Sequence, residues 1–329
     1  MVMVKIDSCK IDIPLSCIES NLLDMVSNDT VKGTAGFKGN LPGFKSLVYN
    51  LGADRAQLEL SAKVLGSDYF AGININSIEQ VFDRICDTGA VMFDRNMSIE
   101  QGKFLRADIT CNVKYENSQQ LTDAFDALFT LQNSNYQVQR FGSLKNRGVT
   151  FSGKQSTFKE RQIFYDKQVE LLHKRNKDFL TYSGDKKKLF VDAQDVLRVE
   201  QNLVQFSRIR SGLNVVNTGL LSVLNSSATP NLKLFQKIRT SGKQCELFNV
   251  DGRLSDIEKL YGRMHIIESF DSDISMIKQF IESKVKGDVS RYIRQYKAII
   301  DNMRSESIFA EPNKLRIVLD DLESRIKVA

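Results

Sequence analysis

The sequence predicts an α+β protein in which helices pack on one face of a mainly antiparallel sheet, with a helical region at its C-terminus. Two observations lead to this expectation. Alternation of apolar and polar residues with a period of two, which is typical of strands, recurs through roughly the first two hundred residues. After about Asn217 the apolar residues take up helical spacing and keep it. Short helices interrupt the strand segments, and that order of elements favours an antiparallel α+β architecture.

Five segments alternate most clearly, and each is predicted to be a strand: 10–15, 57–64, 104–113, 156–165 and 196–206. Ser77 and Ser118 are expected to open helices between these strands. Each serine stands directly ahead of an apolar pattern with helical spacing, which is a signature of a helix N-terminus.

The C-terminal third is predicted to be helical. Leu254, Ile257 and Leu260 are spaced as one stripe of a helix. The polar stretch NSSATPN, residues 225–231, separates this part from the strand-rich part. We therefore expect two domains, a strand-rich one over residues 1–224 and a helical accessory one over residues 225–329.

The composition indicates a globular protein of the cytoplasm. The chain has 329 residues and is 42% apolar, which is enough to bury a sizeable core. No apolar run approaches the roughly 18–20 residues that a membrane span needs, and the first residues lack a secretory signal pattern. The five cysteines are never spaced C-x-x-C, so neither a disulfide framework nor a zinc knuckle is indicated.

Positive charge is concentrated in one part of the chain. Between Arg140 and Lys188 there are thirteen Lys and Arg residues against five Asp and Glu residues, a local charge of +8, while the whole chain carries +6. Nucleic acid is a natural partner for such an excess, because basic side chains that contact phosphates release counterions. A solvated loop and helix face is the simpler explanation of the charge taken alone.

Three predicted strands carry charged residues in their middle. Alternation places Arg106 and Asp108 on one face of their strand, and Arg198 and Glu200 on one face of theirs; Glu59 is a lone carboxylate on a third strand. One explanation is a half-solvated sheet whose opposite charges pair across strands. The other is a polar active-site face.

A tyrosine lies at a predicted strand-to-helix junction in the segment FKERQIFYDKQVELLHKR. Tyr165 stands where the alternation ends, and Lys167 follows at the start of the helix. Such a tyrosine can present its hydroxyl at the edge of a sheet above a basic helix. A ring that packs and leaves its hydroxyl in water is the ordinary alternative.

Taken together, these blocks resemble a known family. The segments KIDSCKIDIPLSCIES, QLELSAKVLGSDYF, FLRADITCNV, FYDKQVELLH and VLRVEQNLV are similar, in the same order, to blocks of the rolling-circle replication initiators of filamentous phages and related plasmids. The resemblance spans roughly residues 1–212. It implies a nicking-endonuclease-like fold and metal-dependent, site-specific nicking and rejoining of single-stranded DNA through a 5′-phosphotyrosine intermediate.

The resemblance also implies roles for individual residues. Tyr165 would be the nucleophile and Lys167 its helper, while Asp108, Glu200 and the weaker candidate Glu59 would be acidic active-site residues. The chain has only two histidines, far apart, so the His-hydrophobe-His metal motif of the wider nuclease superfamily is absent from the sequence. Three carboxylates suit Mg²⁺ or Mn²⁺, which prefer oxygen ligands.

The expected partner is single-stranded DNA at a replication origin. Residues expected to contact it are Arg106, Arg198, Lys145, Arg147, Lys159, Arg161, Lys174 and Arg175. A mobilisation relaxase or a single-tyrosine transposase would run the same chemistry. A non-catalytic nucleic-acid-binding protein, whose carboxylates merely pair with arginines, is the alternative of another class. The C-terminal helices could grip duplex DNA, recruit a host helicase or dimerise, and the sequence leaves the oligomeric state open.

Overall fold

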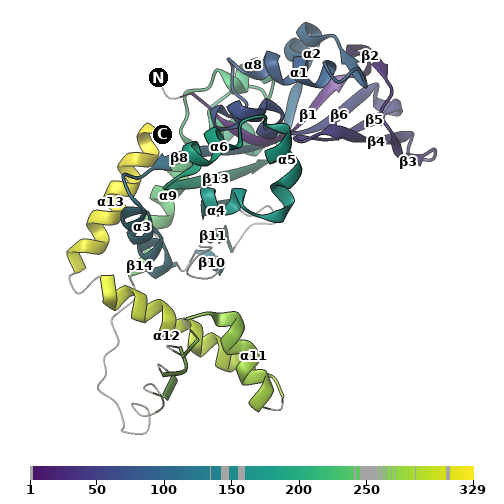
Figure 1. The fold of residues 1–329 in the computed structure, drawn as a ribbon. Helices are drawn as coiled ribbons and strands as arrows, with labels where there is room; N and C mark the ends of the chain where they lie inside the picture. Colours follow the sequence, from purple (N-terminus) through teal and green to yellow (C-terminus); the bar gives the residue numbers. More distant parts are fainter. Residues whose placement is uncertain are drawn as a thin grey trace.

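The protein is built on one large antiparallel sheet (Figure 1). The computed structural model describes residues 3–133, 135–141, 148–154, 160–240, 242–244, 259, 262–263, 265–267, 269–270, 272–285, 287–308 and 312–329. Within these ranges ten strands pair in the order β10-β11-β12-β13-β8-β1-β6-β5-β4-β3, and each neighbouring pair is antiparallel. The predicted α+β class with a mainly antiparallel sheet is therefore confirmed.

The strands of this sheet are β1 (Ile6–Pro14), β3 (Met25–Asp29), β4 (Thr34–Leu41), β5 (Phe44–Asn50), β6 (Arg55–Ser61), β8 (Lys103–Lys114), β10 (Tyr136–Phe141), β11 (Gly148–Gly153), β12 (Arg161–Asp166) and β13 (Val196–Val204). Two small pairs are formed by β2 (Ile18–Asn21) with β7 (Val91–Phe93), and by β9 (Leu131–Asn133) with β14 (Gly242–Gln244).

The α-helices are α1 (Ile78–Cys86), α2 (Arg95–Gln101), α3 (Ser118–Thr130), α4 (Lys167–Leu171), α5 (Lys177–Tyr182), α6 (Lys186–Ala193), α7 (Phe206–Leu213), α8 (Leu220–Leu224), α9 (Pro230–Thr240), α11 (Ile274–Lys284), α12 (Ser290–Ile308) and α13 (Pro312–Val328). The 3₁₀ segments are η1 (Leu15–Cys17), η2 (Leu51–Ala53), η3 (Ala62–Ala71) and η4 (Lys174–Asn176). In the part of the chain that the structure describes, no helix is both long and apolar enough to cross a membrane.

One face of the sheet is apolar and carries the main core. Alternate residues of β1, such as Ile11 and Ile13, are fully buried on this face, and burying each such side chain contributes about 1.5–3 kcal/mol. Helix α2 contacts β1, α7 and α8 contact β8, and α9 contacts β8, β12 and β13. The period-two pattern of the sequence thus places one set of side chains under these helices.

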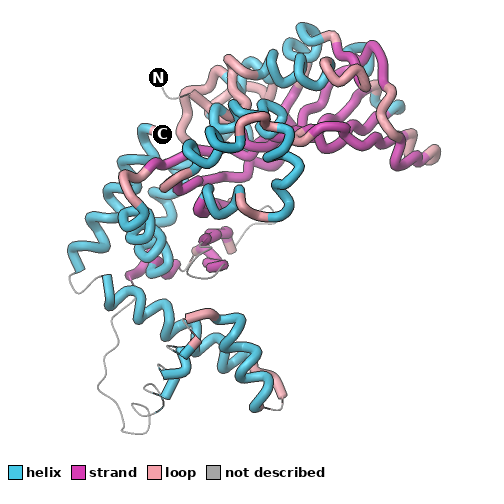
Figure 2. The backbone as a smooth tube through the Cα atoms, in the orientation of Figure 1, coloured by secondary structure: helices cyan, strands magenta, loops and turns pink. Residues whose placement is uncertain are grey.

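The opposite face of the sheet is polar. It carries the even-numbered side chains of β8 and β13, because Asp108 lies opposite Asn202 and Thr110 opposite Glu200 in the strand register. The segment η3 and helices α4 to α6 lie over part of this face, so helices cover both faces rather than one (Figure 2). Tyr182 ties α5 to η3 by donating a hydrogen bond to the Val64 carbonyl oxygen at 3.0 Å.

The C-terminal helices belong to two different packing groups. Leu234 of α9 and Leu322 of α13 share one core with Val199 of β13 and with α3. Helices α11 and α12 form a separate small core around Ile277 and Ile299, and α12 also contacts α3. The predicted division at residue 225 stays a prediction. Helices α9 and α13 pack in the core that also holds β13 and α3.

Candidate active site

Tyr165 occupies the predicted strand-to-helix junction. It is the penultimate residue of β12, and Asp166 ends the strand and caps α4 by accepting a hydrogen bond from the Val169 backbone N–H at 3.1 Å. This cap fixes the direction in which the chain leaves the sheet. Tyr165 lies opposite Arg198 of β13 in the strand register, so its side chain is on the polar face beside that arginine.

The Tyr165 hydroxyl donates a hydrogen bond to Oε1 of Glu200. Burial, and then the nearby charge of Asp7, raise the pKa of the Glu200 carboxyl to about 7. Burial and the Glu200 charge raise the pKa of the Tyr165 phenol well above its usual range, while Arg198 acts in the opposite direction. A phenol is thus paired with a carboxylate whose pKa suits a general base near neutral pH.

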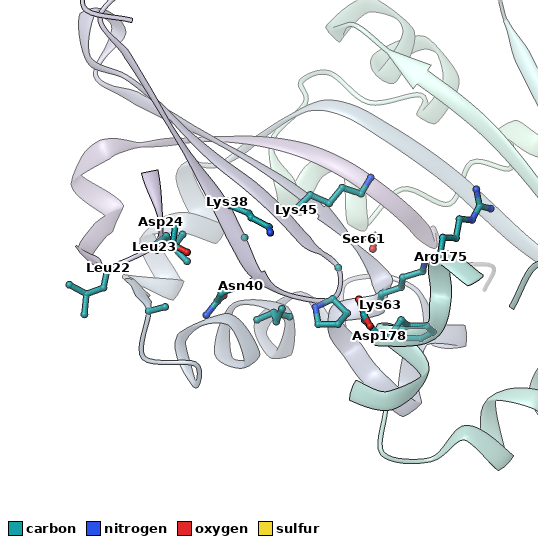
Figure 3. Close-up of a pocket in the computed structure, with 16 residues that line it drawn as sticks. Leu22, Leu23, Asp24, Lys38, Asn40, Lys45, Ser61, Lys63, Arg175 and Asp178 are labelled. Atoms are coloured by element: carbon teal, nitrogen blue, oxygen red, sulfur yellow. The ribbon is translucent and has the colours of Figure 1, made fainter. Parts of the chain in front are cut away.

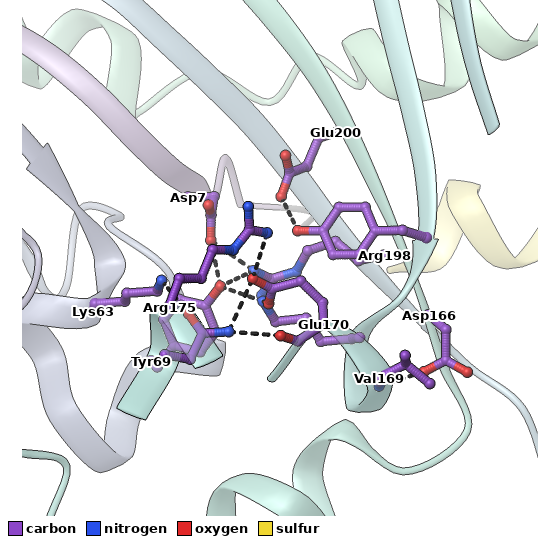
Figure 4. Close-up of polar contacts among 12 residues, drawn as sticks. Asp7, Lys63, Tyr69, Asp166, Val169, Glu170, Arg175, Arg198 and Glu200 are labelled. Atoms are coloured by element: carbon purple, nitrogen blue, oxygen red, sulfur yellow. Dashed lines mark hydrogen bonds and ion pairs between the residues drawn. The ribbon is translucent and has the colours of Figure 1, made fainter. Parts of the chain in front are cut away.

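Arg198 is the centre of a buried charged cluster beside this pair (Figure 4). Arg198 is 1% exposed. Its Nη1 donates to Oδ1 of Asp7 at 2.6 Å and to the Tyr69 hydroxyl. Its Nε donates to Oδ1 of Asn112 at 2.8 Å, and the guanidinium lies 4.8 Å from the centre of the Tyr69 ring. We call Asp7, Tyr69, Tyr165, Lys167, Glu170, Arg198 and Glu200 the tyrosine cluster.

Lys167 supplies the second buried cation of the tyrosine cluster. Lys167 is 1% exposed. Its Nζ donates to the Tyr69 hydroxyl at 2.7 Å and to Oε2 of Glu170 at 2.6 Å. Burial and then Arg198 lower the pKa of Lys167 to about 8. Burial alone would raise the pKa of the Glu170 carboxyl, but Lys167, the Asn176 amide and the charge of Lys63 together lower it to about 2. The Lys167 ammonium lies 5.6 Å from the centre of the Tyr165 ring.

Asp7 and Tyr69 were missed by the sequence analysis. The register of β1 with β8 shifts between Ile6 and Ser8, so a bulge falls at Asp7. A bulge redirects a side chain that strict alternation would place on the other face. Tyr69 lies on η3, where its hydroxyl donates to Oδ1 of Asp7 at 2.8 Å. The motif KIDSCKID contains the acid, but a period-two pattern cannot show a bulge.

The structure does not assemble the predicted carboxylate triad. Asp108 accepts hydrogen bonds from Ser8 and Asn202, each at 2.7 Å. Glu59 lies 3.3 Å from Nη2 of Arg106 and also pairs with a lysine. Within the described ranges, no group of three or more His, Cys, Asp or Glu side chains could hold a metal ion. A shared Mg²⁺ or Mn²⁺ site at Asp108, Glu200 and Glu59 therefore does not fit this arrangement, since two of these residues are engaged around Arg106 and the third with Tyr165.

The residues expected to contact DNA fall into three groups. Lys145, Arg147 and Lys159 lie outside the described residues. Arg161, Lys174 and Arg175 are exposed, and Arg106 is partly exposed on the polar face. Arg198 is buried in the tyrosine cluster, beside Tyr165 in the strand register, rather than along an exposed surface.

No protein-family model matches the chain, and no curated protein matches it.

Proposed function

We propose that the protein is a DNA strand transferase that nicks and rejoins single-stranded DNA, with Tyr165 as the nucleophile. The observation that carries the proposal is the hydrogen bond from the Tyr165 hydroxyl to Glu200, next to the buried cations of the tyrosine cluster. A phenol with an ordinary pKa near 10 is a weak nucleophile at neutral pH and needs a base beside it. Glu200 is such a base.

The chemical step transfers a phosphoryl group to the phenol. Glu200 accepts the Tyr165 proton as the phenol oxygen bonds to the phosphorus atom, and the bond from phosphorus to the leaving sugar oxygen breaks. The departing oxygen takes a proton from solvent water and leaves as a hydroxyl group, and Glu200 returns the proton that it accepted to solvent. In the family that the sequence resembles, this hydroxyl is the 3′-hydroxyl. One phosphoester replaces another, so the reverse step rejoins the strand without an outside energy source.

Electrostatics support this role for the tyrosine cluster. Arg198 lowers the cost of negative charge on Tyr165, and Lys167 lies near the same ring. Buried cations held by fixed partners stabilise negative charge that develops in a transition state, because they need no reorganisation when it appears. Asp7 and Tyr69 hold Arg198 in place, and Glu170 holds Lys167.

The metal dependence implied by the resemblance is a separate part of the proposal. The phosphoryl transfer to Tyr165 is written without a metal ion, because Glu59 and Asp108 are engaged with Arg106, Ser8 and Asn202. Replication initiation in a bacterial cytoplasm is the biological setting that the resemblance favours. A relaxase or transposase would use the same step at Tyr165.

A non-catalytic nucleic-acid-binding protein is the second candidate. It is favoured by the pairing of Glu59 and Asp108 with Arg106, at 3.3 and 3.7 Å, which such a protein would use only to satisfy its charges. This candidate gives no reason for the phenol of Tyr165 to face a carboxylate with a pKa of about 7.

A denaturing gel separates the two candidates. Purified protein is incubated with fluorescent single strands that carry origin-like sequences, with and without Mg²⁺ or Mn²⁺, and denatured. We expect a fluorescent band at the mobility of the protein, lost in Tyr165→Phe. Tyr182→Phe is the matched control, since Tyr182 lies on α5 with its hydroxyl on the Val64 carbonyl oxygen. A band of equal strength in Tyr165→Phe would refute the proposal, and binding without any covalent band would favour the second candidate.

A further inference from the structure

A cavity of about 650 Å³ is lined by residues that include Lys38, Lys63 and Arg175 (Figure 3). It lies between the hairpin of β4 and β5 on one side and η4 with the start of α5 on the other. Four cationic side chains line it, Lys38, Lys45, Lys63 and Arg175, against two acidic ones, Asp24 and Asp178. The volume falls within the range of about 300–1,000 Å³ that is usual for sites of small organic groups. We call this cavity the basic pocket.

The wall of the basic pocket is held by close backbone contacts. Gly43 lies in the turn between β4 and β5 with φ +98°, and a Cβ there would lie 2.3 Å from the Val64 backbone nitrogen. The Gly43 carbonyl oxygen accepts a hydrogen bond from the Ser61 backbone N–H at 2.7 Å. The turn therefore docks tightly onto the junction of β6 and η3, which fixes this wall of the pocket.

The cations of the pocket continue across the polar face of the sheet. The strand register sets Lys38 opposite Ser46, Ser46 opposite Glu59, Glu59 opposite Lys10, and Lys10 opposite Arg106. The Lys38 side chain is exposed and has no ion-pair partner among the residues that the structure describes. The only acid in this row, Glu59, is paired with Lys45 and Arg106, so the row presents positive charge.

The pocket also connects directly to the tyrosine cluster. Nη2 of Arg175 lies 3.0 Å from Oε1 of Glu170, whose other oxygen holds Lys167. Lys63 donates to Oδ1 of Asn176 at 2.8 Å, and Asn176 donates to Oε1 of Glu170 at 3.1 Å. One carboxylate, Glu170, thus separates the basic pocket from Lys167 of the tyrosine cluster.

We propose that the basic pocket binds nucleotides of a single polynucleotide strand adjacent to the phosphate at Tyr165, with Lys38 and Lys45 contacting backbone phosphates. The inference rests on the proposed function, because it assumes that a strand lies across the tyrosine cluster. Tight docking of the hairpin gives the pocket a fixed wall, and the charged row supplies the attraction for a polyanion. Exposed Leu22 at the rim adds apolar surface on which a base can pack.

Binding is measured by fluorescence anisotropy with a labelled single strand of mixed sequence, in the Tyr165→Phe background so that no covalent product contributes. The test variants are Lys38→Gln and the double variant Lys38→Gln/Lys45→Gln. The matched control is Lys233→Gln/Lys327→Gln, which removes the same charge from exposed positions on α9 and α13, helices of the opposite face. Salt titrations give the slope of log K against log salt.

The double variant Lys38→Gln/Lys45→Gln is expected to bind the strand several-fold more weakly than the parent. Its salt slope should be smaller by about 1.4, since each of the two lost phosphate contacts to a single strand contributes about 0.7. The control should keep the parental slope. Equal salt slopes for the two double variants would overturn the inference. It would also be overturned if inorganic phosphate displaced the labelled strand as well as unlabelled strand does at the same concentration of phosphate groups. Weaker binding by the pocket double variant alone, together with no adduct from protein that keeps Tyr165, would support the pocket and refute the nicking proposal.

Discussion

Replacing Arg198 by Met should destabilise the fold strongly, because it removes the main counterion of Asp7, an acid whose side chain is only 20% exposed. Burial would raise the pKa of Asp7, yet Arg198 and Lys167 more than offset this and leave that pKa below its usual value. Arg198→Met removes the ion pair at 2.6 Å, leaves Asn112 without its donor and leaves the Tyr69 hydroxyl with Lys167 alone as donor. Loss of one member of a buried pair costs about 3–5 kcal/mol.

The assay is urea denaturation of four proteins: the parent, Arg198→Met, Asp7→Asn and the double variant. In the double variant no charged acid is left facing an empty position, so its loss of unfolding free energy should be smaller than the sum of the two single losses by about 1–3 kcal/mol. An Arg198→Met protein that loses less than about 1 kcal/mol, or a strictly additive double variant, would refute the view that Asp7 and Arg198 form the buried centre of the site.

Three further outcomes follow from the tyrosine cluster. Glu200→Gln should slow adduct formation by about 10²-fold or more, because it removes the general base. It should also abolish the rise in rate through pH 7 that is expected of the parent, and an unchanged pH profile would contradict the role of Glu200. The same variant should gain stability relative to the parent as pH rises from 4.5 to 7, since folded Glu200 binds its proton more tightly than the unfolded chain does, and urea midpoints across this range measure it. Tyr69→Phe should cost about 1–3 kcal/mol in unfolding free energy, because the hydroxyl that joins Asp7, Lys167 and Arg198 is lost, and a neutral effect in the same denaturation assay would show that these charges do not depend on it.

Much of the fold could be predicted from local patterns. The segment 104–113 was predicted to be a strand and is the middle of β8. Helix α3 is capped by Asn117 rather than by the predicted Ser118, a shift of one residue. The hairpins β3–β4–β5 and β10–β11 were not predicted. Glycine-rich segments such as 33–43 have weak alternation, and their strands are held by pairing with neighbours in the sheet rather than by their own propensity.

The candidate site could be predicted in part. Tyr165, Lys167, Arg198 and Glu200 were singled out, and the structure brings them into one cluster, because strand register converts alternation into a shared face. The grouping of the carboxylates could not be predicted, since cross-strand pairing decides which acid each arginine meets. Arg106 forms ion pairs with Glu59 and Asp108. Arg198 pairs with Asp7, whose side chain is redirected by a bulge.

Peptide mapping of the covalent product tests the central claim most directly. Trypsin cuts after Arg161 and Lys167, so Tyr165 lies alone among tyrosines in the peptide 162–167. After nuclease and trypsin digestion of protein incubated with single-stranded DNA, mass spectrometry should find this peptide with a phosphonucleotide on Tyr165. The same modification on another residue, or a peptide 162–167 that stays unmodified while an adduct forms, would contradict Tyr165 as the nucleophile.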